Sequence, residues 1–269
     1  MRLALAQLDP VAGDVEANER AALSAIADAA SGGADVVALP ELWDVGYFAF
    51  DRYADAAESL AGERLGRIAD AAADHDVAVL AGTVVEDLAA SAADGLDVPA
   101  RSGYANASVL FDSSGARRLV YRKHHLFGYD SAEADLLVPG ERLDTADVGG
   151  FTVAATTCYD LRFPELYREL LDAGATLVLV PSAWPYPRVE HWRTLARARA
   201  VENLWYLGAV NGAGDQRDST LLGRSTVYDP WGTPVATTDD DPDIVFADLD
   251  PGRVADVRTS FPALDDRRT

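Results

Sequence analysis

Short apolar runs alternate with alanine-rich helical segments along almost the whole chain, and this alternation restricts the possible folds more than any other feature. Strand-like runs are expected at residues 3–8, 36–39, 77–84, 105–111, 118–121, 151–157, 177–180, 206–210, 225–228, 234–237 and 244–249. Helices are expected between them, at residues 17–30, 59–74, 163–173 and 190–203. Residues 86–102 are small and polar, so an exposed excursion is expected there. No linker or repeat divides the chain, and the pattern predicts one α/β domain over residues 1–269 with both sheet faces covered.

The charge of the chain is strongly negative. The formal net charge is −21, from 44 acidic and 23 basic residues; 32 of the acids are Asp, and 22 of the bases are Arg. A dispersed, Asp-rich and Lys-poor surface indicates adaptation to a high-salt cytoplasm, where screening weakens self-repulsion. An ordinary acidic cytosolic protein is the alternative. Such a charge argues against a nucleic-acid partner, whose phosphates need a basic patch.

The compartment expected from the sequence is the cytoplasm. One cysteine allows no intrachain disulfide, which fits a reducing interior. The segment Met1–Asp9 becomes polar too soon for a signal peptide. No stretch approaches the roughly 20 apolar residues of a membrane span, so no membrane partner is expected.

Three residues lie where catalytic groups are expected in an α/β fold. The single cysteine, Cys158, follows an apolar strand and precedes a helix, and the backbone N–H of Tyr159 lies next to it in the chain. Glu41 ends another apolar strand. Lys123 is the one lysine in a chain that otherwise uses arginine, whose planar fork cannot replace a compact ammonium at a small oxyanion. The alternatives are a buried apolar cysteine, a surface carboxylate and a solvated loop cation.

The segments around these residues resemble the three motifs of the nitrilase superfamily of carbon–nitrogen hydrolases. They follow the order of that family and read Pro40-Glu41-Leu42, Tyr121-Arg122-Lys123-His124-His125-Leu126-Phe127 and Cys158-Tyr159-Asp160-Leu161-Arg162-Phe163-Pro164-Glu165. The intervals of 82 residues from Glu41 to Lys123 and 35 from there to Cys158 look typical of the family. The resemblance continues through Ser182-Ala183-Trp184-Pro185 and His191–Asn203, and it covers nearly the whole chain.

The resemblance implies a nitrilase-like, four-layer α-β-β-α sandwich. Two such sandwiches would pair into a homodimer through the helix after Cys158 and the helix around residues 190–203. The resemblance also implies a catalytic triad of Glu41, Lys123 and Cys158. Glu133 is implied as an assisting second glutamate, with an exposed loop acid as its alternative.

Other motif residues are expected around the substrate. Tyr159 is implied to hold the oxyanion through its backbone N–H, and the resemblance makes Tyr47, Tyr159 and Trp184 plausible pocket walls. Core packing is the alternative for each of these side chains. Asp160 and Arg162 are expected to brace the nucleophile turn and the dimer face rather than to touch the substrate.

The implied reaction is hydrolysis of a non-peptide C–N bond in a small linear amide. Glu41 takes the proton of the Cys158 thiol, the thiolate attacks, ammonia leaves, and water releases the acid from a thioester. No cofactor or metal is expected. His124-His125 point to opposite sides of an extended chain and lack accompanying zinc ligands, and Gly212-Ala213-Gly214 lacks the dinucleotide pattern.

The motifs look nearest to the ω-amidase-like branch, whose members act on small dicarboxylate monoamides. The alternatives within the family are an N-carbamoyl amino-acid hydrolase and an aliphatic nitrilase, since specificity resides in loops and not in the shared triad. A further alternative, of another class, is a non-catalytic scaffold that binds a partner protein.

Overall fold

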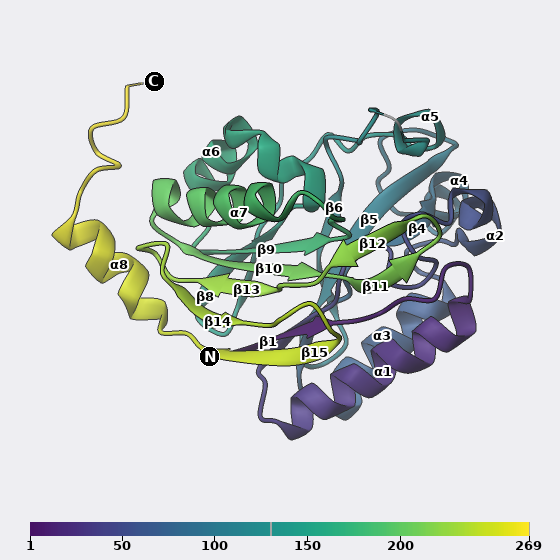
Figure 1. Ribbon diagram of the computed structural model, residues 1–269, viewed down its shortest axis with the longest axis horizontal. Coiled ribbons are helices and arrows are strands. Elements are labelled where there is room, and N and C mark those ends of the chain that lie inside the picture. Colours follow the sequence, from purple (N-terminus) through teal and green to yellow (C-terminus); the bar gives the residue numbers. More distant parts are fainter. Residues whose placement is uncertain (130, 269) are drawn as a thin grey trace.

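Two mixed β-sheets lie face to face at the centre of the computed structural model, which describes residues 1–129 and 131–268 (Figure 1). The first sheet has the strand order β15 (Asp243–Asp248), β1 (Arg2–Gln7), β2 (Val36–Ala38), β3 (Ala78–Leu80), β5 (Tyr104–Phe111) and β4 (Val84–Asp87), with β6 (Arg117–Arg122) paired to β5. The second has the order β14 (Pro234–Thr237), β13 (Thr226–Tyr228), β10 (Tyr206–Asn211), β9 (Leu177–Ser182), β8 (Phe151–Ala155) and β7 (Ala146–Val148). A separate hairpin joins β11 (Ala213–Gln216) to β12 (Ser219–Leu222).

Helices cover the outer face of each sheet. The helices α1 (Val15–Ser31) and α3 (Glu63–Asp74) pack on the first sheet, and α6 (Pro164–Asp172) and α7 (Val189–Asn203) pack on the second (Figure 1). The remaining helical segments are η1 (Phe50–Arg52), α2 (Tyr53–Ala56), α4 (Leu88–Ala93), α5 (Glu133–Leu136), η2 (Cys158–Arg162) and α8 (Pro251–Ser260). The expected layering of helices, sheet, sheet and helices is confirmed for the single chain.

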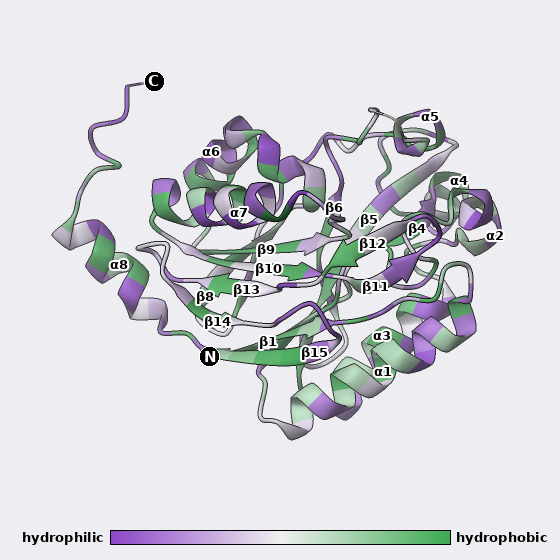
Figure 2. Cartoon of the chain, in the orientation of Figure 1, coloured by the Kyte–Doolittle hydropathy of each residue, from purple (hydrophilic) through white to green (hydrophobic). Residues whose placement is uncertain are grey.

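The main core lies between the sheets. Leu3, Leu5 and Leu110 of the first sheet meet Leu179 and Val210 of the second, and all five side chains are inaccessible to solvent. Figure 2 shows that the strands facing one another, such as β1, β9 and β10, are largely hydrophobic, while polar residues interrupt the helices. Removal of this apolar surface from water is the main term that holds the sheets together. Within the described residues, no helix is both long and apolar enough to cross a membrane.

The structure corrects two of the predicted elements near the site. The expected strand 77–84 is divided into β3 and β4, because Gly82 adopts φ +54° between them. The expected excursion 86–102 holds α4, and Glu86 is fully buried where it binds Arg122 through two hydrogen bonds of 2.5 and 2.7 Å. The polar composition of residues 86–102 did not reveal the burial of Glu86, since its partner Arg122 lies 36 residues away.

Other boundaries differ less. The helix expected at 59–74 begins at Glu63, after a turn in which the Gly62 N–H donates to the Ser59 carbonyl (2.8 Å). The sequence patterns did not predict β7, β11, β12 or α8. These are short or strongly polar elements, and periodicity identifies such elements poorly.

Candidate active site

Three strand ends converge at one end of the sandwich. Glu41 follows β2, and Lys123 directly follows β6, both of the first sheet. Cys158 follows β8 of the second sheet. The site therefore lies where the two sheets meet, and it is assembled from segments distant in sequence.

A close backbone approach holds the turn that carries Glu41. A Cβ atom at Gly82 would lie only 2.0 Å from the Pro40 carbonyl oxygen, so only glycine permits this packing. Thr83 follows Gly82 and completes the support: its N–H donates to the Pro40 carbonyl (3.2 Å) and its hydroxyl accepts from the Leu42 N–H (2.9 Å). The break in the predicted strand thus positions the glutamate.

Cys158 lies on a sharp turn at the start of η2. Its φ of +46° is the left-handed conformation that non-glycine residues rarely adopt, and such strain concentrates at functional positions. The buried Asp160 carboxylate caps the turn by accepting the Thr157 N–H (2.9 Å). It also accepts the Tyr121 hydroxyl (2.5 Å) and the His125 N–H (3.0 Å), which ties the lysine segment to the nucleophile turn. The expected bracing role of Asp160 agrees with these contacts.

The carboxylates of Glu41 and Glu133 flank the Lys123 ammonium. Its Nζ lies 2.8 Å from Glu41 Oε1 and 2.7 and 3.0 Å from the two oxygens of Glu133. The side chains of all three residues are fully buried, so Glu41 and Glu133 are not surface acids and Lys123 is not a solvated cation. The Cys158 thiol lies close enough to Glu41 and Lys123 for both charges to act on it.

Burial and neighbouring charges determine the protonation of this group. Burial raises the pKa of the Glu41 carboxyl above its ordinary 4.5; the Lys123 ammonium opposes this shift and the Glu133 carboxylate adds to it. Burial disfavours the Lys123 ammonium, but the two carboxylates outweigh it and hold the pKa of Lys123 well above 10.5. Burial and the charge of Glu41 raise the pKa of the Cys158 thiol well above 9.0. The resting site therefore holds a protonated thiol beside a base.

A cavity of about 440 Å³ opens onto Cys158 and Lys123. Tyr47, Tyr159 and Trp184 line it, as the sequence analysis expected for pocket walls. Further aromatic side chains, Phe48, Phe50 and Phe127, complete the apolar part of the lining. The volume suits a small molecule.

Two arginines add positive charge to this cavity. The guanidinium of Arg162 lies 5.1 Å from the ring centre of Trp184 and 5.7 Å from that of Tyr159, and the guanidinium of Arg188 lies 5.6 Å from that of Phe127. Arg162 was expected to brace the turn away from the substrate, but it lines the cavity. Asp218 is the acidic residue among the described lining residues, so the wall is cationic overall.

All seven residues singled out from the sequence for catalysis or binding meet at this site. Tyr47 donates to Glu133 (3.0 Å), and Lys123 Nζ lies 5.4 Å from the centre of its ring. Asn106 was not predicted from the sequence, and its Nδ2 donates to Glu41 Oε1 (2.9 Å) and Glu133 Oε1 (3.3 Å). A polar residue inside the apolar run 105–111 was the available signal.

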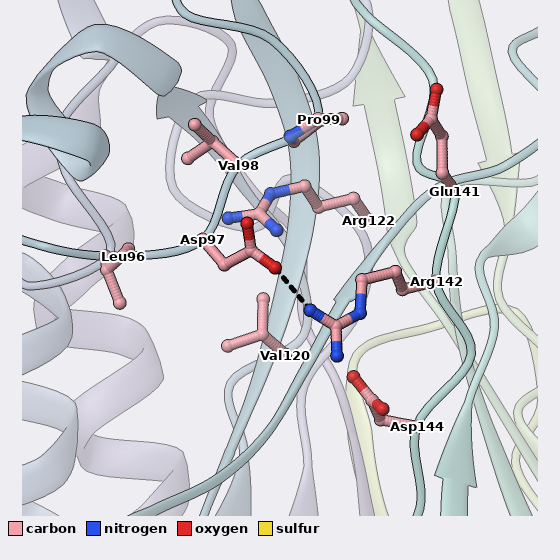
Figure 3. Close-up of a pocket in the computed structure, with 9 residues that line it drawn as sticks. All are labelled: Leu96, Asp97, Val98, Pro99, Val120, Arg122, Glu141, Arg142 and Asp144. Carbon is pink, nitrogen blue, oxygen red and sulfur yellow. Dashed lines mark hydrogen bonds and ion pairs between the residues drawn. The ribbon is translucent and has the colours of Figure 1, made fainter.

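A second pocket, of about 290 Å³, lies apart from this site (Figure 3). Charged side chains line much of it, including Arg122, Glu141 and the ion pair of Asp97 with Arg142. None of its described lining residues is a cysteine, serine or threonine, and Arg122 precedes Lys123 with its guanidinium bound to Glu86 instead of the triad. Across residues 1–129 and 131–268, no group of three or more His, Cys, Asp or Glu side chains is placed to hold a metal ion.

Comparisons with known proteins agree with this geometry. Residues 2–259 match the family model described as carbon-nitrogen hydrolase. The chain is 37% identical over 253 residues to the 2-oxoglutaramate amidase of Paenarthrobacter nicotinovorans, covering 91% of this chain and 83% of that protein. It is 31% identical over 275 residues to an omega-amidase of Mus musculus, covering 99% of this chain and 95% of that one.

A solved structure is similar along almost the full length. A cysteine-to-alanine mutant of the amidase from Nesterenkonia sp. AN1, in complex with butyramide, superposes with a TM-score of 0.79 at 28% identity. The match covers 98% of this chain and 96% of that chain. This chain therefore belongs to the carbon–nitrogen hydrolases of the nitrilase superfamily, as the family match, the two relatives and the buried Glu41–Lys123 pair beside Cys158 all indicate.

Proposed function

We propose that the protein is an amidase of the ω-amidase type, which hydrolyses the terminal amide of a small dicarboxylate monoamide to ammonia and a carboxylate. The observation that carries this proposal is the cavity itself: it opens onto Cys158 and Lys123 and presents two guanidinium groups along an aromatic wall. The names of the two relatives support the same reaction class. An N-carbamoyl amino-acid hydrolase and a nitrilase remain the alternatives to be tested.

In the first half-reaction Glu41 is the general base and Cys158 the nucleophile. Glu41 takes the thiol proton while the sulfur bonds to the amide carbon, and the carbonyl π pair moves onto oxygen. Collapse of the tetrahedral intermediate breaks the C–N bond. Glu41 returns the proton to the nitrogen, which leaves as ammonia, and a thioester remains on Cys158.

In the second half-reaction water replaces the sulfur. Glu41, assisted by Glu133, takes a proton from the water as its oxygen bonds to the thioester carbon. Collapse breaks the C–S bond, and the proton returns to the departing sulfur. The carboxylic acid is released and gives up its proton to solvent, and the Cys158 thiol is restored.

Lys123 and the Tyr159 N–H are the proposed donors to the oxyanion. The backbone N–H of Tyr159 donates to no acceptor within the described part of the chain, so it is free to bind substrate. Lys123 has three N–H bonds; one reaches Glu41 and one can be shared by the two oxygens of Glu133, which leaves a third. Donors placed in advance stabilise the developing charge without reorganisation.

The substrate class is testable with matched amides. We expect wild-type protein to release ammonia faster from an anionic ω-monoamide, such as a 2-oxo dicarboxylate monoamide, than from butyramide of similar length. Arg188→Gln and Arg162→Gln should each lower kcat/KM for the anionic substrate by about 10- to 100-fold, because a charge-assisted hydrogen bond is lost. Both variants should hydrolyse butyramide nearly normally.

N-carbamoyl amino acids and aliphatic nitriles are tested as substrates beside the two amides. Arg193→Gln, which removes an exposed arginine of α7, is the control for the Arg162 and Arg188 variants. Release mainly from an N-carbamoyl substrate or a nitrile would contradict the ω-amidase assignment. An equal loss on butyramide in the Arg188 variant would contradict its role with carboxylates.

The α6 and α7 layer is also the proposed homodimer interface. Val201 of α7 is 43% exposed, and beside this layer Trp231 of the β13–β14 turn and Phe261 after α8 are 43% and 49% exposed, with ring centres 5.7 Å apart. Such exposed apolar side chains favour a covered surface. Sedimentation in 3 M KCl should give twice the mass of one chain, and Val201→Asp should reduce it to the monomer. A wild-type monomer at micromolar concentration would refute this arrangement.

Salt adaptation is proposed from the charge. The run Asp239, Asp240, Asp241 and Asp243 is exposed, and the whole chain carries −21, so repulsion among like charges destabilises the fold at low salt. We expect the melting temperature to rise by about 10 °C between 0.1 M and 3 M KCl. Betaine at the same osmolality does not screen charge and serves as the control. Equal midpoints at the two KCl concentrations would refute a halophilic, high-salt cytoplasmic origin.

A further inference from the structure

Asn106 brings a buried amide into contact with both glutamates, and the two half-reactions give it no role. The residue lies on β5, is inaccessible to solvent, and accepts the Lys123 backbone N–H at its own carbonyl (2.9 Å). Its Nδ2 lies 2.9 Å from Glu41 Oε1 and 3.3 Å from Glu133 Oε1. An amide nitrogen carries two hydrogens, so it can serve both acceptors at once.

Asn106 and Lys123 bridge the same two oxygen atoms. Lys123 Nζ lies 2.8 Å from Glu41 Oε1 and 2.7 Å from Glu133 Oε1, the two atoms that Asn106 also contacts. Two buried carboxylates with one ammonium leave an excess of negative charge. A neutral N–H donor stabilises the ionised form of each carboxylate without adding another charge.

The orientation of this amide follows from its neighbours. Rotating it by half a turn would place Oδ1 against the two carboxylate oxygens, which would repel it. In the observed orientation Oδ1 is buried and accepts no hydrogen bond from the described residues. A buried acceptor without a protein donor costs stability, and the two contacts of the nitrogen account for its retention here.

We propose that Asn106 is a positioning residue: its amide keeps Glu41 ionised and aligned toward Cys158, with Glu133 held beside it. This inference rests on the proposed role of Glu41 as the base. Glu41 Oε1 receives both bridging donors, whereas Oε2 receives the Ala183 N–H (2.9 Å), so the carboxylate is fixed in rotation at both ends. Without the amide, Glu41 takes up a proton at higher pH, and Lys123 alone holds Oε1.

The test is the rate at which iodoacetamide alkylates Cys158 across a pH range, since this reaction needs the thiolate but breaks a C–I bond and no C–N bond. In the wild type the rate should fall as the pH decreases through the pKa of Glu41, because the protonated carboxyl cannot take the thiol proton. Asn106→Leu keeps bulk but removes the donor. This variant should slow alkylation at neutral pH about 10-fold. The acidic limb, which is the fall of the alkylation rate at low pH, should move upward by about one pH unit.

Turnover should respond in the same direction. In Asn106→Leu, kcat for the best amide is expected to fall about 10- to 100-fold while KM changes less, since the geometry of the base and not substrate binding is altered. Ser108→Ala is the matched control. Ser108 lies two residues along the same strand and is also fully buried, and its hydroxyl has no hydrogen-bond partner among the described residues. It should show the wild-type pH profile.

Asn106→Asp provides a second variant of nearly the same shape. It places a third carboxyl group against Glu41, and the negative charge of this group, once ionised, should move the acidic limb upward. If circular dichroism shows that Asn106→Leu does not fold, Asn106→Asp alone tests whether Asn106 positions Glu41. A wild-type limb in the folded variants would overturn the positioning role and leave the amidase proposal intact.

Glu41→Gln distinguishes the two proposals. Slow alkylation in this variant, with a shifted limb in the Asn106 variants, supports both. Alkylation at the wild-type rate in Glu41→Gln would show that Glu41 is not the base, and it would overturn the positioning role together with the proposed mechanism.

Discussion

Replacing Cys158 by alanine is expected to lower kcat for amide hydrolysis by at least about 10⁴-fold, because no other group in the site can form the thioester. Cys158 is the only cysteine in the chain, so no second thiol can substitute for it. Ammonia release in single-turnover conditions measures the loss. The small change in volume should leave the fold intact, which the thermal midpoint reports.

Cys158→Ser is the informative partner variant. It keeps a hydroxyl at the strained turn, but a weaker nucleophile should leave only a small fraction of the activity. Wild-type turnover in the alanine variant would mean that water attacks the amide directly, and the thioester route would be wrong. A protein whose cellular function survives the alanine change would instead fit the scaffold alternative.

Lys123→Arg is expected to lower kcat/KM by about 10³-fold, although the charge is kept. The Lys123 side chain is fully enclosed, with three carboxylate oxygens between 2.7 and 3.0 Å from Nζ. A guanidinium is larger than this space, and overpacking costs stability. Its planar fork would also bind carboxylates through two oxygens and turn Glu41 away from Cys158. Steady-state kinetics and a thermal melt measure the two effects.

Arg122→Lys is the matched control for this substitution. Arg122 is the preceding residue, and its guanidinium binds Glu86 outside the triad. The control should lose stability but retain turnover. Near-normal activity of Lys123→Arg would show that the single lysine is not needed as a compact oxyanion donor.

Much of the site could be predicted from local sequence. Glu41 and Cys158 each follow an apolar strand and Lys123 directly follows β6, and strand ends that meet at one edge are where α/β folds bind ligands. The singular lysine and cysteine marked two of the three positions. The surrounding motifs identified the third, and they also indicated Glu133 and the pocket residues.

The rest depends on contacts between distant segments, which periodicity does not determine. Asn106 binds Glu41 across 65 residues, and the Ala183 N–H binds the same carboxylate across 142. The sequence around Glu41 reveals neither of these two donors. Arg162 was expected away from the substrate because its motif position does not show where the guanidinium lies.

In the fold, too, local patterns predicted the elements, whereas features set by contacts between distant segments were missed. The alternation of apolar and helical segments predicted most strands and the main helices, but not the strand order, which brings β5 between β3 and β6 in the first sheet. The break at Gly82 was missed because its cause is the Pro40 carbonyl, more than 40 residues earlier. This break positions Glu41, so the error in the predicted strand coincides with a functional feature.

The most direct test of the account is rapid-quench mass spectrometry of the protein mixed with a dicarboxylate monoamide in high KCl. We predict a transient adduct on Cys158 whose mass is that of the substrate less ammonia, formed and lost at rates that match turnover. Glu41→Gln should form it slowly. Steady ammonia release without any adduct on Cys158, under conditions that would trap a thioester, would contradict the mechanism.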